Sequence, residues 1–270
     1  MNLGRKLCLK DKALIAMVHV GALPGTPCSK SSIDEIANHA AAEALSLAHA
    51  GFDAIIIENM HDRPYLLRDV GPEITASMTR VAVEVRRAVD LPIGVQILAG
   101  ANTAALAVAA AADLQFVRAE GFVFAHVADE GIMNEASAAT LLRYRKQISA
   151  ENVAIIADIK KKHSSHAMTA DVDLAATAHA AAFFGADGVV VTGGATAQAA
   201  TVGDVASASE ATLPVLVGSG LNPENLSEYW PHANGFIVGS SLKIDGVWSN
   251  PLDADRIAAF VQSASRLRKA

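Results

Sequence analysis

Cysteine is scarce in this sequence, which contains only Cys8 and Cys28 among 270 residues. The two thiols could form one disulfide, but a chain long enough to bury a large core favours reduced cysteines and a cytoplasmic location. No uncharged apolar run approaches the roughly 18–20 residues that a membrane-spanning helix needs. The opening residues MNLGRKLCLKDK have no apolar run and include Asp11, so no signal peptide is expected.

Blocks of basic residues are also missing. Lysine and arginine total 22 against 28 acidic residues, which gives a net charge of −6 and argues against a nucleic-acid partner. Hydrophobic residues make up 51% of the chain and charged residues 19%, a composition typical of a globular protein. No linker or shift in composition divides the chain. We therefore expect one domain over residues 1–270, with residues 1–12 as an N-terminal extension that covers one end of the fold.

A repeat of short apolar strands and alanine-rich helices runs through the chain. The expected strands are Ala13–Val20, Asp53–Glu58, Pro92–Leu98, Leu114–Arg118, Asn152–Lys160, Ala186–Thr192, Leu213–Gly218 and Gly235–Gly239. The expected helices are Ser31–Ala50, Pro72–Val89, Thr103–Ala112, Ser137–Ile148, Asp171–Phe184, Ala197–Glu210, one that begins at Asn222, and Pro251–Arg266. Continuous Val, Ile and Ala runs are typical of parallel strands that are buried on both faces. The repeat predicts an α/β fold, a single (β/α)8 TIM barrel, with its active face at the carboxyl ends of the strands.

Two similar stretches end the last two expected strands, VLVGSG at Val215–Gly220 and FIVGSS at Phe236–Ser241. Small residues let backbone N–H groups approach an anion, and serine hydroxyls add donors. Strands seven and eight of a barrel often end in a phosphate site. The predicted phosphate-binding residues are Gly193, Gly194, Gly218, Ser219, Gly220, Gly239, Ser240 and Ser241, with Lys243 expected to reach the same phosphate. The alternative is that both stretches are ordinary strand-to-helix turns.

The fifth strand carries two residues that we expect to be catalytic, Asp158 and Lys160. Residues two apart on a strand share a face, so both are expected to point into the barrel mouth. There the carboxylate could hold the ammonium group for proton transfer or for binding an anionic intermediate. The alternative is a salt bridge that closes the top of the core. His19 and Glu58, at the ends of the first two strands, are the other catalytic candidates, and each could instead be a structural buried residue.

Further polar residues are expected at the same opening. Gln96 lies in the third strand, Arg118 and Glu120 end the fourth, and Thr192 ends the sixth. We predict that these four residues bind the substrate, because a guanidinium group in particular can clamp a carboxylate or a second phosphate. Glu43, on the first helix, is expected at the surface.

Two loops remain to be explained. The segment Ala119–Glu135 is longer than most strand-to-helix connections and too apolar for disorder, so we expect a lid over the mouth. The loop KKKHSSH places His163 and His166 three residues apart, where they could bind a divalent metal together with Asp158, His126 or Asp129. No HExxH motif or cysteine cluster supports a metal, and the loop could simply attract an anion. No cofactor is predicted, and a divalent metal stays open as an alternative.

Several longer motifs extend over nearly the whole chain. They are MVHVGALPGTP at Met17–Pro27, IENMHDRPYL at Ile57–Leu66, GVQIL at Gly94–Leu98, the DIKKKHSSH loop, VTGGAT at Val191–Thr196, VGSG and IVGSSLKIDGVWSNPLD. In combination these motifs resemble the BtpA/SgcQ family. The resemblance implies a barrel of the ribulose-phosphate-binding type. The family takes its name from a role in photosystem I accumulation, and the resemblance brings no catalytic residues with it.

These features together predict an enzyme that acts on a small phosphorylated sugar or nucleoside-derived metabolite. Isomerisation, lyase-type aldol cleavage and cleavage of a glycosidic bond are the reactions considered. Two alternatives stay open: a non-catalytic assembly or regulatory factor of the photosystem I biogenesis type, and a metal-dependent hydrolase. The expected partner is the phosphorylated metabolite, and the alanine-rich helices could also pack against a second copy in a homo-oligomer.

Overall fold

Eight parallel strands form the centre of the molecule, for which the computed structural model describes residues 9–269. The strands are β1 (Ala13–His19), β2 (Ala54–Glu58), β3 (Ile93–Gln96), β4 (Phe116–Ala119), β7 (Ala154–Ile159), β9 (Gly188–Thr192), β10 (Val215–Gly218) and β11 (Gly235–Val238). They close into a barrel in the order β1-β11-β10-β9-β7-β4-β3-β2. This arrangement confirms the predicted (β/α)8 fold.

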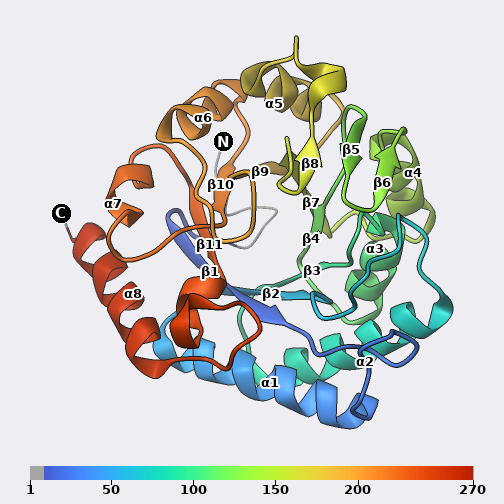
Figure 1. Cartoon of the computed structure of the whole chain (residues 1–270), viewed down its shortest axis with the longest axis vertical. Coiled ribbons are helices and arrows are strands. Elements are labelled where there is room, and N and C mark those ends of the chain that lie inside the picture. The colour runs from blue at the N-terminus through green and yellow to red at the C-terminus, as the bar shows by residue number, and fades with distance from the viewer. Residues whose placement is uncertain (1–8, 270) are drawn as a thin grey trace.

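Helices surround the barrel on all sides (Figure 1). They are α1 (Ile33–Ala50), α2 (Pro72–Ala88), α3 (Asn102–Ala111), α4 (Ala138–Gln147), α5 (Leu174–Phe183), α6 (Val202–Ala208), α7 (Leu226–Tyr229) and α8 (Ala254–Leu267). Short 3-10 turns are η2 (Ala167–Thr169), η3 (Ser209–Ala211), η4 (Ser240–Leu242) and η5 (Ile244–Gly246). Among the described helices, none combines the length and the apolar character that a membrane crossing requires.

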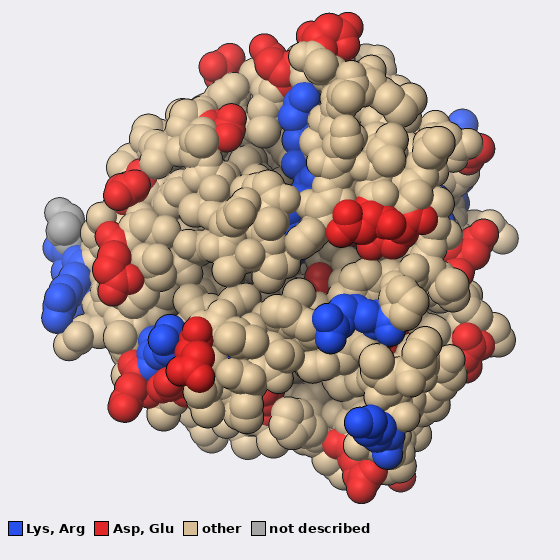
Figure 2. Space-filling view, viewed as in Figure 1, with Lys and Arg blue, Asp and Glu red and all other residues tan. Residues whose placement is uncertain are grey.

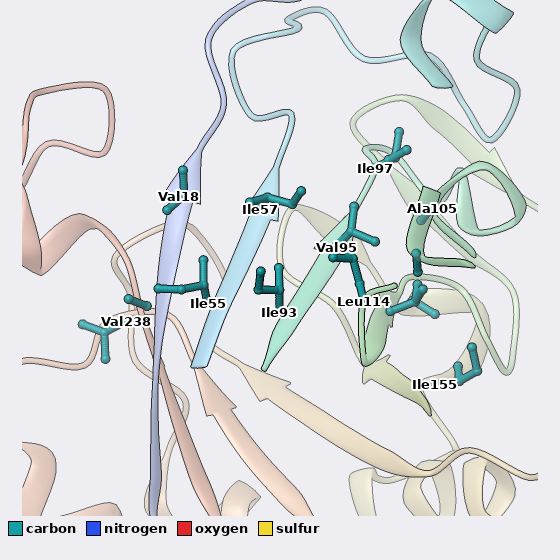
Figure 3. Packing of buried hydrophobic residues seen from close by; sticks show 14 of the residues in the cluster. Val18, Ile55, Ile57, Ile93, Val95, Ile97, Ala105, Leu114, Ile155 and Val238 are labelled. Carbon is teal, nitrogen blue, oxygen red and sulfur yellow. The ribbon is translucent and has the colours of Figure 1, made fainter. Parts of the chain in front are cut away.

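Each barrel strand is buried on both faces because alternate residues serve two different cores. Val18, Ile55 and Ile57 point outward and pack under the helices (Figure 3). Ile56 and Phe116 point inward and belong to a separate cluster inside the barrel. This two-residue period is the reason why the strands read as continuous apolar runs.

Glycine makes room for the large inner side chain of the barrel. Gly94 on β3 pairs in register with Phe116 on β4. A Cβ added at Gly94 would lie 2.1 Å from the Phe116 ring. The aromatic ring therefore occupies the space that a side chain on β3 would otherwise fill. Because the interior is closely packed, a larger residue at Gly94 would clash with this ring.

A small antiparallel sheet replaces the expected loop at residues 119–135. It consists of β5 (His126–Ala128), β6 (Gly131–Met133) and β8 (Ser164–Ser165), in the order β6-β5-β8. Gly131 has φ of +123°, a conformation that glycine adopts without strain in a tight turn. The segment that we expect to be a lid therefore has secondary structure of its own. The sheet joins this segment to the KKKHSSH loop, because Val127 pairs with Ser165.

Several helix starts differ from the predicted ones because capping residues select them. Asp173 caps α5 by accepting the N–H of Ala176, so the helix begins after the predicted Asp171. Thr201 caps α6, whereas Ala197, the predicted start, has φ of +65°. The side chain of Asn222 accepts the N–H groups of Glu224 and Asn225 in a turn, so α7 begins only at Leu226. Such side-chain turns compete with helix initiation.

The N-terminal segment can be compared with its prediction only from residue 9 onward. Leu9 is buried in the cluster inside the barrel, and Lys12 donates to the carbonyls of Trp230 and Ala233 at 2.6 and 2.7 Å. These contacts fit an extension that covers the amino-terminal end of the barrel. Cys8, the other half of the possible disulfide, lies outside the described residues, and Cys28 is exposed.

Candidate functional site

A ring of buried polar side chains lies at the carboxyl ends of the barrel strands. Each member follows an inward-facing residue by two positions, so strand alternation aims it into the barrel. All are at most 9% exposed. The ring consists of His19 on β1, Glu58 on β2, Gln96 on β3, Arg118 on β4, Asp158 on β7 and Thr192 on β9. The inward placement predicted for these six residues agrees with the structure, whereas their chemical roles stay predictions.

Two adjoining cavities open above this ring. The first has a volume of about 230 Å³ and the second about 290 Å³. They share the lining residues Glu58, Met60, Lys162 and Thr196, so together they form one elongated mouth. In Figure 2, drawn from the same side as Figure 1, acidic and basic side chains lie around the hollow at the centre of this face. A polar cavity of this size suits a small charged metabolite.

The first cavity contains the ends of β10 and β11. Ser219, Gly220, Gly239, Ser240 and Ser241 all line it. The Ser241 Oγ is buried and has no hydrogen-bond partner within residues 9–269. Gly220 has φ of +66°, and a Cβ there would lie 2.2 Å from the backbone N of Ala199. The turn therefore requires glycine, and the buried hydroxyl beside it lacks a partner that a ligand could supply.

The remaining predicted phosphate-binding residues lie elsewhere. Gly193, Gly194 and Gly218 are not among the residues that line the first cavity. Thr196 and Ala197, from the same loop as the Gly-Gly pair, line it instead. An added Cβ at Gly218 would meet Val190 Cγ1 at 3.2 Å, so this glycine allows close strand packing in the layer beneath. The predicted phosphate-binding role of these three glycines therefore has no support from the cavity lining and stays a prediction.

Arg118 and Asp158 form a buried ion pair across adjacent strands. Arg118 Nε lies 3.1 Å from Asp158 Oδ1, and Nη2 lies 3.1 Å from Oδ2. This two-point geometry matches a planar guanidinium to a carboxylate. Burial raises the pKa of Asp158, and the adjacent Arg118 opposes the rise. Asp158 thus pairs with arginine, where the sequence had suggested Lys160.

His19 and Glu58 face each other on β1 and β2. His19 Nε2 lies 3.9 Å from Glu58 Oε2, and His19 Nδ1 donates to the carbonyl of Trp248 at 3.0 Å. Burial lowers the pKa of His19 to about 3, so the ring is neutral with Nε2 free to accept a proton. Burial also raises the pKa of Glu58, with Arg118 and Lys162 opposing. Burial therefore keeps His19 neutral and favours the protonated form of Glu58, so that Glu58 can hold a proton beside an imidazole nitrogen that accepts hydrogen bonds.

Lys160 does not follow Asp158 into the mouth. The strand β7 ends at Ile159, and Lys160 has φ of +47°, which breaks the alternation. Its Nζ donates to the carbonyl of Thr169 at 3.4 Å, and its side chain lines neither large cavity. The predicted position of Lys160 is therefore wrong. Lys162, two residues further on, reaches both cavities, which the run of three lysines alone could not reveal.

The second cavity carries its own buried charges. Glu120, predicted to bind substrate, accepts Lys161 Nζ at 3.3 Å through one oxygen, while its other oxygen has no partner within the described chain. The Gln96 Oε1 likewise lacks a partner there. Both residues line this cavity. Their free acceptors could bind the donors of a polar ligand, as substrate-binding residues would.

An aromatic and cationic group forms the outer rim of the second cavity. The Arg63 guanidinium lies 4.9 Å from the centre of the Trp248 ring, and the His61 ring centre lies 4.7 Å from that of Trp248. No functional role is predicted from the sequence for these three residues. Trp248 belongs to the segment between β11 and α8, far from the other two in sequence, so only the tertiary structure brings them together.

His163 and His166 are not brought together as metal ligands. His163 Nε2 lies 2.9 Å from Thr196 Oγ1, whereas His166 Nε2 lies 3.0 Å from the carbonyl of Lys161. Within residues 9–269, no group of three or more His, Cys, Asp and Glu side chains is arranged to hold a metal ion. The residues proposed for a metal site therefore do not fit one.

Lys243 and Glu43 differ most from their predicted surroundings. Lys243 is 2% exposed, and its Nζ lies 2.6 and 2.9 Å from the two carboxylate oxygens of Glu43. Glu43 is therefore buried, where a surface position was expected, and Lys243 is held away from the phosphate position that we predicted. The pair joins α1 to the segment that carries Ser241 and Trp248.

Replacing His19 with asparagine is expected to reduce the loss in the free energy of unfolding as the pH falls below about 6.5. Below about pH 6.5 the unfolded chain takes up a proton at His19 that the folded chain, with a pKa of about 3, does not. Wild-type stability therefore falls as the pH falls from about 6.5 towards 3. Asparagine does not titrate, and it can still donate to the Trp248 carbonyl. Between about pH 7 and pH 5, the wild type should lose about 2 kcal/mol more than the variant.

Urea unfolding at these two pH values measures the difference. The raised pKa values of Glu58 and Asp158 act in the opposite sense, because a proton held in the folded state favours folding below the folded pKa. Both carboxyl groups remain in the variant, so their effect largely cancels in the comparison. Equal losses in the two proteins would show that His19 is not buried in its neutral form.

Comparisons with known proteins show close relatives over the full length. A model of the BtpA family matches residues 10–266. A protein of Caenorhabditis elegans, described as mitochondrial, is 44% identical over 98% of this chain and 97% of its own length. The Photosystem I biogenesis protein BtpA of Synechocystis is 32% identical over 93% of this chain and 87% of its own length. These relatives confirm the resemblance that the motifs had indicated.

Solved structures share the fold at low sequence identity. Thiamine phosphate pyrophosphorylase from Pyrococcus furiosus matches with a TM-score of 0.57 at 15% identity, covering 98% of this chain and 99% of that one. Phosphoribosyl anthranilate isomerase from Thermus thermophilus matches with a TM-score of 0.58 at 14% identity, covering 95% and 100%. At such identities the likeness establishes the barrel and nothing about the reaction.

Proposed function

This chain belongs to the BtpA family, and we propose that it is an enzyme acting on a small phosphorylated sugar or nucleoside-derived metabolite. The phosphate would bind at one end of the mouth, and the reacting carbon would lie over the buried ring. A cytoplasmic location and self-association remain predictions.

The observation that carries the proposal is the unpartnered hydroxyl of Ser241. A buried polar atom without a partner costs free energy that a bound ligand can recover. It lies in a cavity formed by the ends of β10 and β11, where Gly220 and Gly239 keep side chains away from the backbone. Arg256 from α8 lines the same cavity and supplies a positive charge. Hydroxyl groups, exposed backbone and a guanidinium are the groups that bind phosphate.

The centre of the mouth supports proton transfer next to a carbonyl group. Glu58 and neutral His19 can hold and move a proton, as their pKa shifts and spacing indicate. Arg118 and Lys162 supply positive charge beside them, which would stabilise negative charge that develops on a substrate oxygen. An isomerase or lyase uses this combination of groups. Isomerisation or aldol-type cleavage is therefore favoured over glycosidic cleavage.

Replacing Ser241 with alanine is expected to weaken phosphate binding between about tenfold and a hundredfold. A hydrogen bond to a charged group contributes about 1.5–3 kcal/mol, and about 1.4 kcal/mol corresponds to tenfold in affinity. Calorimetric titration with inorganic phosphate and ribose 5-phosphate measures the change. Ser209→Ala is the matched control, because its hydroxyl bonds only the Ala206 carbonyl on the outer surface.

A thermal-shift screen of sugar and nucleoside phosphates would identify the substrate class first. A ligand at about 100 times its Kd adds roughly 2.7 kcal/mol, which is several degrees for a barrel of this size. If no phosphate compound binds either the wild type or the control, the enzyme proposal fails. The assembly-factor alternative, which the name of the Synechocystis relative favours, would then be the better explanation.

A further inference from the structure

Lys162 lies where the two cavities of the mouth meet, and it lines both. Its position is fixed by the backbone, because its N–H donates to Thr192 Oγ1 at 3.1 Å. The side chain is only partly exposed. The residue therefore presents an amine at the centre of the mouth, between the proposed phosphate end and the second cavity.

The Lys162 amine differs from its two buried neighbours in having no partner. Lys161 is paired with Glu120, and Lys243 with Glu43. Within residues 9–269, the Lys162 Nζ has no hydrogen bond and no carboxylate within ion-pair distance. A lysine that serves only to stabilise the fold is normally paired when it is buried. An amine without such a partner is available to a ligand.

The surroundings of Lys162 also favour the neutral amine. Burial lowers its pKa, and the positive charge of Arg118 lowers it further, while Glu58 and Asp158 act in the opposite sense. Desolvation and a neighbouring cation are the two usual ways in which proteins make a lysine nucleophilic. The position of the unpartnered amine between the two cavities and the lowered pKa of Lys162 therefore both favour a nucleophilic role.

We propose that Lys162 is a nucleophile that forms a Schiff base with the carbonyl carbon of a phosphorylated aldehyde or ketone. This inference rests on the proposed function and names its substrate class. The Nζ lone pair adds to the carbonyl carbon, and the carbonyl oxygen takes a proton and leaves as water after a second proton transfer. The resulting C=N bond, protonated on nitrogen, then accepts the electron pair of an adjacent C–H or C–C bond as that bond breaks.

Glu58 and His19 are the groups placed to carry the protons in these steps. Both line the first cavity together with Lys162. A protonated Glu58 can deliver the proton to the departing oxygen, and the resulting carboxylate can then accept one from the adjacent carbon. No oxidant or further reactant is needed, because the only by-product of Schiff-base formation is water.

Borohydride trapping with pyridoxal 5′-phosphate tests the proposal on the intact protein. This probe carries both an aldehyde and a phosphate, and reduction fixes it to the lysine that it reaches, which peptide mass spectrometry then identifies. We expect labelling of Lys162 to be at least about tenfold faster than that of Lys160, because a phosphate bound in the first cavity would hold the aldehyde beside Lys162. The burial that lowers the pKa of Lys162 acts in the same direction, since it leaves more of the amine unprotonated. Inorganic phosphate should slow the labelling of Lys162 alone.

Two lysine variants make the result decisive. Lys162→Arg keeps the positive charge and should abolish the preferred labelling, whereas Lys160→Arg, whose lysine bonds the Thr169 carbonyl, should leave it intact. Labelling spread evenly over surface lysines, or unchanged in Lys162→Arg, would overturn the Schiff-base proposal. If phosphate still binds in the Ser241 titration, the proposed function survives that failure. If neither binding nor preferred labelling occurs, both proposals fail.

Discussion

Replacing Asp158 with asparagine is expected to lower the free energy of unfolding by about 3–5 kcal/mol, the cost of leaving one member of a buried ion pair without its partner. The change keeps the shape of the side chain but leaves the Arg118 guanidinium buried, where it is 5% exposed. Arg118 would then lie beside Lys162 with less compensating charge. Chemical denaturation of both proteins measures the effect directly.

Three comparisons separate this effect from a general loss of charge. Glu84→Gln breaks the surface pairs with Arg80 and Arg87 and is expected to lower the free energy of unfolding by no more than about 1 kcal/mol. The double variant Asp158→Leu, Arg118→Met removes both buried charges and should recover most of the loss. Phosphate binding should persist in folded Asp158→Asn, because Asp158 does not line the first cavity. A loss in Asp158→Asn no larger than in Glu84→Gln would contradict a buried pair.

The second large effect is expected at Lys243, which lies outside the ring of buried polar side chains. Lys243→Met should also lower the free energy of unfolding by about 3–5 kcal/mol, because the Glu43 carboxylate would stay buried with no cation beside it. The ion pair between Lys243 and Glu43 also connects the segment that carries Ser241 and Trp248 to α1. We therefore expect weaker phosphate binding in this variant as well, because the Lys243 N–H donates to the carbonyl of Ser240, which lines the first cavity.

A double-mutant cycle tests this prediction. Lys243→Met and Glu43→Leu are each expected to be destabilising, while the double variant should lie close to the wild type, so that the coupling is large. Lys146→Met, which removes the exposed pair with Glu151, is the matched control and should change little. Additive losses at Lys243 and Glu43 would mean that the two side chains do not interact in the folded protein.

The positions of the candidate phosphate-binding turns and of the candidate proton-transfer groups could be predicted from the sequence for the same local reason. A strand exposes every second residue to one face, so the positions of His19, Glu58, Arg118 and Asp158 at strand ends predicted that they would converge. The serine and glycine residues after β10 and β11 were recognised because such turns repeat in barrels. Neither inference needed knowledge of any distant contact.

Prediction failed where a single turn or a distant partner decided the outcome. The positive φ of Lys160 ends the alternation of β7 one residue early, so Lys162 occupies the position in the mouth that we had assigned to Lys160. Glu43, the partner of Lys243, lies 200 positions away in the sequence, and no local sequence pattern predicts the pairing. Trp248 reaches His19 and Arg63 only because the segment after β11 folds back over the mouth.

The sequence by itself therefore determined the barrel, the family and the inward-facing ring, since the period of a strand, the capping of a helix and the composition of a turn are local properties. The tertiary structure decided which lysine reaches the mouth, which charges are paired and which polar atoms are left for a ligand. These depend on backbone turns and on side chains that meet from opposite ends of the chain. The partner of a buried charge is set by packing, and packing is a property of the whole fold.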